Sequence, residues 1–215
     1  HVSYLDSLSD ATGASIFAGL TFMRSAKLKG TINQGLWVLR RESAGGGRTI
    51  EYIWQGKQHP IKQETAMGVK GYRPHITLVE FPIGSKTPTR VAAAICYDST
   101  DLDLIADLRE QSDMFLVSAL NQDVTTFDNM VAALNFHMYQ PVILANSGEF
   151  GGSTAQLPLP RHEKLLAHVH GGNQVAVSVF EVDPSLFKTT VPVAKPAELK
   201  TAPAGYTGRP RRISP

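Results

Sequence analysis

The residue with the greatest capacity for chemistry is Cys96, the one cysteine among 215 residues. It ends the apolar run 91–96 and precedes the polar run 97–100, a pattern that predicts a buried strand followed by a turn into a helix. A thiol on such a turn lies beside the free N–H groups of the helix, which can stabilise a thiolate and an oxyanion. Cys96 is therefore a candidate nucleophile, although a lone cysteine is more often a buried hydrophobe without chemistry.

The elements that would position this thiol follow from the spacing of apolar residues. Strand, helix, strand, helix and strand succeed one another over residues 91–146, which is typical of an α/β fold. The first of these helices is expected to be capped by Thr100, the second to span 125–140, and a further helix to span 5–12. Strands are expected at 15–23, 32–40, 49–55, 76–81, 91–96, 114–120, 141–146, 165–170 and 174–182.

Composition limits the classes of protein to consider. Hydrophobic residues make up 42% and charged residues 19%, which is ordinary for a globular protein, and a net charge of +2 does not indicate nucleic-acid binding. One cysteine excludes an internal disulfide framework and favours a reducing compartment, so we expect a cytoplasmic protein. Apolar runs are all much shorter than the roughly 20 residues of a membrane span, so we expect no membrane contact.

The chain is expected to consist of one domain, residues 1–185, and a tail, residues 186–215. Six of the 13 prolines lie between Pro184 and Pro215, with few large apolar residues, which indicates an extended or disordered tail. The first residue is His1 rather than Met, so we expect this sequence to be part of a longer polypeptide.

Four segments, taken in order, resemble motifs of the carbon–nitrogen hydrolase (nitrilase/amidase) superfamily. The segment 95–98, Ile-Cys-Tyr-Asp, resembles the nucleophile motif, and 52–64, with Lys57 and a terminal Glu64, is similar to the lysine motif. Residues 17–20 together with Asn33 resemble the strand pair that precedes the lysine motif in the family. Residues 145–153 are similar to the segment that lines the family's substrate cleft. The resemblance covers about residues 13–183.

This resemblance implies an α/β fold, a four-layer α-β-β-α sandwich whose N-terminal strand and helix are missing from this chain. It implies Glu–Lys–Cys chemistry, in which Lys57 favours the Cys96 thiolate and the thiolate attacks an amide, carbamoyl or nitrile carbon. Lys57 and the backbone N–H of Tyr97 would hold the oxyanion, Glu64 would orient Lys57, and water would resolve the thioester. The same resemblance places substrate-binding residues at Asn121, Asn146, Gly148 and Ser153, and it requires no cofactor.

Each of these residues also has an ordinary structural interpretation. Lys57 could be a solvated charge at a strand end, and Glu64 a weak surface ion-pair partner. Asn146 and the glycines that follow it could form an ordinary turn. The ordered set, rather than any single residue, favours catalysis.

The chain departs from the family at its first catalytic residue, a Glu that serves as general base. Residues 1–12 do not offer it, because Asp6 and Asp10 lie too close to Gly13. We therefore expect a hydrolase of the amidase/nitrilase type whose base is supplied upstream of this chain. The alternative is a non-catalytic nitrilase-like interaction module fused to another domain of a larger protein.

A third interpretation is a papain-like Cys–His hydrolase that uses His75 or His137. The seven histidines show no metal-ligand spacing, so no metal site is expected. The expected partners are a small-molecule amide or nitrile, further copies of the chain, and additional domains of the same polypeptide. Nucleic acid would be bound only through such a fused domain.

Overall fold

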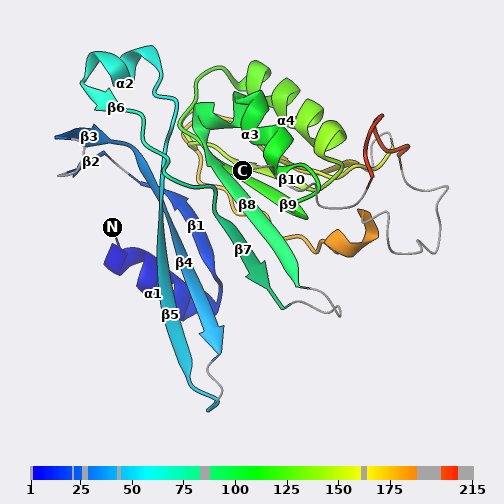
Figure 1. Cartoon of the computed structure of the whole chain (residues 1–215), viewed down its shortest axis with the longest axis horizontal. Coiled ribbons are helices and arrows are strands. Elements are labelled where there is room, and N and C mark those ends of the chain that lie inside the picture. Colours follow the sequence, from blue (N-terminus) through cyan, green and yellow to red (C-terminus); the bar gives the residue numbers. More distant parts are fainter. Residues whose placement is uncertain are drawn as a thin grey trace. The chain divides into compact units, whose positions relative to one another are not determined.

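The computed structural model describes residues 2–20, 22–25, 29–42, 45–82, 88–160, 164–187 and 200–207. The chain divides into two compact units, His1–Ile76 and Thr77–Pro215. As Figure 1 shows, the described part of the first unit contains short sheets and two helices, whereas the second contains one larger sheet with helices.

The first unit is built around strand β4 (Gln34–Glu42), which lies between β1 (Ile16–Gly19) and β5 (Arg48–Gly56) in an antiparallel sheet. A second small sheet has the order β2-β3-β6. The remaining elements of the unit are β2 (Met23–Ser25), β3 (Gly30–Ile32), β6 (Val69–Lys70), α1 (Val2–Thr12) and α2 (Lys62–Ala66).

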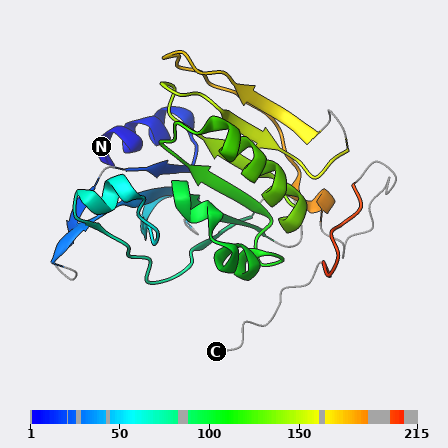
Figure 2. The ribbon, with the colours of Figure 1, turned by 90° about the horizontal axis from the view of Figure 1, so that it is seen from above.

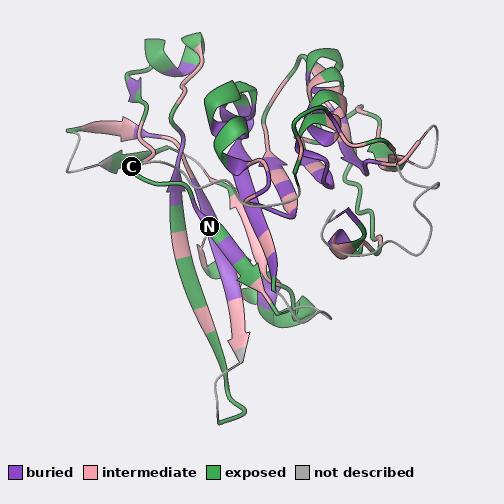
Figure 3. Cartoon of the chain, turned by 45° about the vertical axis from the view of Figure 1, so that its right-hand side comes forward, coloured by how far each residue is buried: buried purple, intermediate pink, exposed green. Residues whose placement is uncertain are grey.

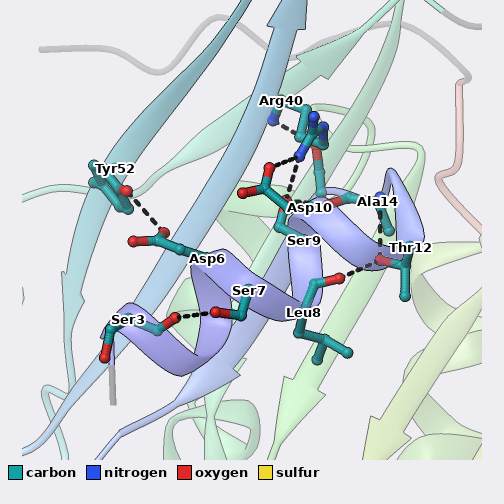
Figure 4. Close-up of polar contacts among 11 residues, drawn as sticks. Ser3, Asp6, Ser7, Leu8, Ser9, Asp10, Thr12, Ala14, Arg40 and Tyr52 are labelled. Atoms are coloured by element: carbon teal, nitrogen blue, oxygen red, sulfur yellow. Dashed lines mark hydrogen bonds and ion pairs between the residues drawn. The ribbon is translucent and has the colours of Figure 1, made fainter.

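Helix α1 packs on β4 because the two elements share an apolar core. Leu5 of the helix forms a buried cluster with Leu36 and Val38, which lie on one face of the strand. Polar contacts surround this cluster: Arg40 pairs with Asp10 at 2.6 Å, and the Tyr52 hydroxyl donates to Asp6 at 2.7 Å (Figure 4). The helix is thus fixed to the sheet by both apolar and polar contacts.

The second unit contains a six-stranded sheet of order β12-β11-β10-β9-β8-β7, in which β12, drawn in yellow, lies at one edge (Figure 2). The three central strands β8, β9 and β10 run parallel, and the outer strands pair antiparallel. The strands are β7 (Leu78–Phe81), β8 (Thr89–Ile95), β9 (Met114–Ser118), β10 (Val142–Ala145), β11 (Ser153–Gln156) and β12 (Leu165–Val169).

Helices α3 (Leu102–Leu108) and α4 (Val124–Met138) connect the parallel strands. Both crossovers step in the same direction across the sheet, so the right-handed rule places both helices on one face. Their buried residues recur at helical spacing and pack toward the sheet (Figure 3). The buried apolar residues are Leu104, Ile105 and Leu108 in α3, and Phe127, Val131, Leu134 and Met138 in α4.

Part of the expected tail packs against the second unit. The buried Glu110 carboxylate accepts hydrogen bonds from the backbone N–H and the hydroxyl of Thr207 at 2.6 and 2.8 Å. Tyr206 packs against Tyr139, and burial, together with the charge of Glu110, raises the pKa of Tyr206 to about 12. Residues 188–199 and 208–215 of that tail lie outside the described residues.

Most of the expected strands and helices are present. The helix after Cys96 is capped by Asp101 rather than Thr100, because the Asp101 carboxylate accepts the N–H groups of Asp103 and Leu104. The expected strand 15–23 is two strands, β1 and β2. No strand is formed over 174–182. The short elements α2, β3, β6 and β11 and the 3-10 turn Pro184–Phe187 were not predicted.

Candidate active site

Cys96 lies directly after the parallel strand β8, in a short 3-10 turn, Cys96–Thr100. Its backbone has φ +50°, a left-handed conformation that is costly for a residue with a side chain. The buried Ser99 hydroxyl donates to the Cys96 carbonyl at 2.6 Å and holds the turn closed. A strained strand-to-helix turn of this kind is typical of positions that hold a nucleophile.

The register of the sheet places three loops of the second unit at one edge. Ile95 of β8 pairs with Ser118 of β9, and Ser118 pairs with Ala145 of β10. The residues that follow, including Cys96 and Asn146, therefore leave the sheet at the same level. Since neighbouring strands lie about 4.8 Å apart, these two backbones are about 10 Å from each other.

Asn146 connects the loops that follow β9 and β10. Its Oδ1 accepts the N–H of Asn121 at 2.9 Å, and its Nδ2 donates to the carbonyls of Asn121 and Gly151 at 2.8 and 2.6 Å. Its backbone N–H donates to the Ser153 hydroxyl at 2.9 Å. Three of the predicted binding residues are thus brought together, and both Nδ2 hydrogens of Asn146 are used in ordering the loops.

Gly148, the fourth predicted binding residue, lies in the loop after β10. Its carbonyl accepts the N–H of Gln174 at 3.3 Å. A Cβ at this position would lie 2.2 Å from the Gln174 carbonyl oxygen, so only glycine allows this approach. Gly148 therefore brings the chain after β12 close to the loop that Asn146 organises.

Gly151→Ala is expected to lower the free energy of unfolding by about 3 kcal/mol. Gly151 has φ +74°, and an added Cβ would lie 2.1 Å from the backbone nitrogen of Gly171. Gly46→Ala is the matched control, because Gly46 has φ +78° with no atom within 4 Å, so only about 1 kcal/mol of backbone strain is expected there. Urea unfolding of both variants measures the difference; equal losses would show that the close approach to Gly171 has no energetic weight.

Lys57 and Glu64 form a buried ion pair in the first unit. Lys57 follows β5, Glu64 lies in α2, and their side chains are 2% and 7% exposed, with Nζ and Oε2 2.5 Å apart. Glu64 also accepts the backbone N–H of Ile61 at 2.8 Å and the side-chain amide of Asn33 at 2.7 Å. The backbone N–H of Lys57 donates to the Asn33 carbonyl at 2.9 Å, so Asn33 contacts both members of the pair.

The protonation state of Glu64 follows from this environment. Burial by itself would raise the pKa of Glu64, but the hydrogen bonds from Lys57, Ile61 and Asn33, with the Lys57 charge, outweigh it. The pKa of Glu64 therefore lies below its ordinary value, and the carboxylate is ionised at neutral pH. An ionised Glu64 keeps the Lys57 ammonium oriented.

The lowered pKa of Glu64 makes stability depend on pH. A carboxyl whose pKa is lower in the folded than in the unfolded chain stabilises the fold above its unfolded pKa, about 4.5, and this contribution is lost as the pH falls through the folded pKa. We expect the difference in unfolding free energy between the wild type and Glu64→Gln to shrink below pH 4.5. Urea unfolding from pH 7 to pH 3 measures it; a difference independent of pH would contradict the ionised pair.

Asn33 was noted in the sequence only through its resemblance to a family strand motif, and its contact with Glu64 was not predicted. Asn33→Leu removes the donor to Glu64 and should raise the pKa of Glu64 toward its ordinary value. As the pH is lowered, the free energy of unfolding of the Asn33→Leu variant should begin to fall at a higher pH than that of the wild type. The contact joins residues 31 positions apart, so spacing along the chain gave no signal for it.

The two groups of candidate residues belong to different units. Lys57 and Glu64 lie together in the first unit. The second unit contains the other candidates, which are Cys96, Tyr97, Asn121, Asn146, Gly148 and Ser153. Tyr97 follows Cys96 in the turn, with 47% of its surface exposed.

His137 does not fit a papain-like pair with Cys96. It lies in the last turn of α4, which leads to the beginning of β10. Because β8 and β10 are parallel, the beginning of β10 and the end of β8, where Cys96 lies, are at opposite edges of the sheet. The papain-like interpretation is therefore wrong for His137. The other histidine considered for this role, His75, lies in the first unit and is exposed.

Among the described residues, no cluster of three or more His, Cys, Asp or Glu side chains could hold a metal ion. None of the helices in the described ranges is both long and apolar enough to cross a membrane.

Solved structures of the carbon–nitrogen hydrolase superfamily have the same fold as this chain. A superfamily protein from Xanthomonas campestris matches with a TM-score of 0.59 and 15% identity, over 80% of this chain and 64% of its own. An amidase from Nesterenkonia sp. matches with a TM-score of 0.58 and 12% identity, over 79% and 62%. A variant of the Nesterenkonia sp. AN1 amidase, with the acetamide moiety of fluoroacetamide added covalently at its active-site cysteine, matches with a TM-score of 0.56 and 14% identity, over 79% and 63%.

These matches confirm the resemblance seen in the sequence at the level of fold, and they confirm the α/β class. The chain spans less than two thirds of the length of these structures. No protein-family model and no curated protein sequence matches the chain. The four-layer arrangement of the sandwich stays a prediction.

Proposed function

We propose that the protein hydrolyses a non-peptide C–N bond, in an amide, carbamoyl or nitrile group, through a thioester at Cys96. The observation that supports this most directly is the left-handed Cys96 at the end of a parallel strand, in a fold shared with amidases. A non-Gly residue in this conformation costs about 1–2 kcal/mol, and such strain is concentrated at functional sites.

In the proposed reaction the Cys96 thiolate attacks the carbonyl carbon of an amide and forms a tetrahedral oxyanion. The Lys57 ammonium and the backbone N–H of Tyr97 stabilise that oxyanion, each by about 3 kcal/mol by analogy with other oxyanion holes. Collapse of the intermediate breaks the C–N bond, and the nitrogen takes up the proton that the general base removed from the Cys96 thiol, so that ammonia or an amine leaves. Water then attacks the thioester and releases the acid.

Glu64 has a positioning role in this proposal. It is ionised, buried and hydrogen-bonded by three donors, so it holds the Lys57 ammonium in place rather than exchanging protons with water. The general base that activates water is a carboxylate outside these 215 residues. We propose that the longer polypeptide supplies it upstream of His1.

The proposed substrate class is a small linear amide. A mutant of the amidase from Nesterenkonia sp. AN1 has been solved in complex with butyramide. In this chain, Asn121, Gly148 and Ser153 border the edge at which Cys96 lies, and they would form one side of the binding site. We also propose that the protein forms homo-oligomers, that further domains are fused to this chain, and that the protein is located in the cytoplasm.

Fluoroacetamide tests the proposal on the chain as it exists, because alkylation of the thiolate does not need the upstream base. Intact mass spectrometry should show addition of one acetamide group, at Cys96, in the wild type. Lys57→Met should slow the addition at neutral pH, because the proposed cation that favours the thiolate is absent. Equal rates for the two proteins would favour the alternative, a non-catalytic interaction module.

A further inference from the structure

The peptide bond between Cys96 and Tyr97 contains the backbone donor of the proposed oxyanion site. This planar group joins the Cys96 carbonyl to the Tyr97 N–H, and no peptide bond among the described residues is cis. In a trans peptide the C=O and N–H bonds point in opposite directions. A contact that fixes the direction of the Cys96 carbonyl therefore also fixes the direction of the Tyr97 N–H.

The Ser99 side chain makes such a contact. Its hydroxyl donates to the Cys96 carbonyl oxygen at 2.6 Å, and Ser99 is completely buried. Because the backbone hydrogen bonds of a 3-10 turn are poorly aligned, this short side-chain bond is the stronger restraint on the carbonyl. The Ser99 Oγ also lies 3.0 Å from Sδ of Met130 in α4, but a thioether is a weak acceptor, so the one hydroxyl proton points to Cys96.

The Tyr97 N–H lies on the other side of the same peptide plane. Among the residues that the structure describes, none accepts a hydrogen bond from it. Ser99 binds the carbonyl from the buried side of the turn, so the N–H points away from Ser99. A donor that is oriented in advance and not already paired stabilises charge that develops only in the transition state.

We propose that Ser99 is a positioning residue that orients the Tyr97 N–H toward the developing oxyanion, an inference that rests on the proposed function of Cys96. The oxyanion forms only when the thiolate adds to the carbonyl carbon of the substrate. Loss of the Ser99 bond should therefore slow the chemical step and leave substrate binding unchanged. It should also leave the thiolate itself unchanged, because the Ser99 hydroxyl contacts the Cys96 carbonyl.

Ser99→Ala tests this in the extended polypeptide, that is, the chain together with the residues that its gene encodes upstream of His1. The kcat for butyramide hydrolysis should fall about 30-fold, a part of the 10²–10³-fold loss that removal of a whole oxyanion donor causes, and KM should change less than about threefold. Alkylation of Cys96 by fluoroacetamide should keep the wild-type rate, because displacement of fluoride from a tetrahedral carbon forms no oxyanion. A variant that is only less well folded would lose both reactions to the same extent.

Thr100→Val is the matched control, because the Thr100 hydroxyl donates to the Tyr97 carbonyl at 2.8 Å, the same type of bond one peptide further along. Thr100 is exposed, and its bond restrains the peptide after Tyr97, so kcat should equal that of the wild type. An unchanged kcat in Ser99→Ala, or equal losses of hydrolysis and alkylation, would overturn this inference alone. No hydrolysis by the wild type would overturn the proposed function, and this inference with it.

Discussion

Glu64→Gln is expected to lower the free energy of unfolding by about 3 kcal/mol at neutral pH. Lys57 and Glu64 are almost completely buried, and the substitution leaves the Lys57 ammonium without its counter-charge. Lys57→Met should destabilise by less, because Ile61 and Asn33 still donate to the Glu64 carboxylate. Chemical denaturation of each variant at pH 7 gives these values.

The double variant Lys57→Met/Glu64→Gln removes both charges and should be more stable than Glu64→Gln alone, since replacing a buried ion pair is often nearly neutral. The double-mutant cycle then gives the coupling energy of the pair. Glu51→Gln is the matched control: Glu51 pairs with Arg41 at 3.2 Å, but the side chains of Arg41 and Glu51 are 35% and 50% exposed, so less than about 1 kcal/mol is expected. Equal losses for Glu64→Gln and Glu51→Gln would show that the Lys57 pair is not buried in solution.

Cys96→Ala should reduce amide hydrolysis by the extended polypeptide on the order of 10³-fold or more, because no other group in the proposed mechanism forms the thioester. The measurement is release of ammonia from butyramide. Tyr97→Phe is the control, since the proposed role of Tyr97 rests on its backbone N–H and its side chain is half exposed. Full turnover by Cys96→Ala would exclude the proposed chemistry.

Replacing Cys96 by glycine should affect activity and stability in opposite directions. Cys96 has φ +50°, a conformation that glycine adopts without strain. Cys96→Gly should therefore be inactive, yet more stable than Cys96→Ala by about 1 kcal/mol. Unfolding experiments on the two variants measure the difference. A glycine variant that is the less stable of the two would show that the turn stores no strain.

The sequence by itself determined the elements that depend on local patterns. The buried run before Cys96 and the apolar stripe of α4 were predicted from residues within one or two turns of each other, because side-chain burial imposes a period on neighbouring residues. The order of motifs around Lys57 and Cys96 was also enough to predict the fold that the chain shares with these solved structures. These features need no knowledge of what lies across the molecule.

Only the tertiary structure decided which groups meet. The contact of Asn33 with Glu64 and the hydrogen bonds between Asn121 and Asn146 join residues 31 and 25 positions apart, and their geometry is set by packing. The same reason explains the failure at 174–182, where the pattern is that of a strand but no described strand pairs with it. A strand needs a partner for its backbone, and the sequence of one segment does not contain that partner.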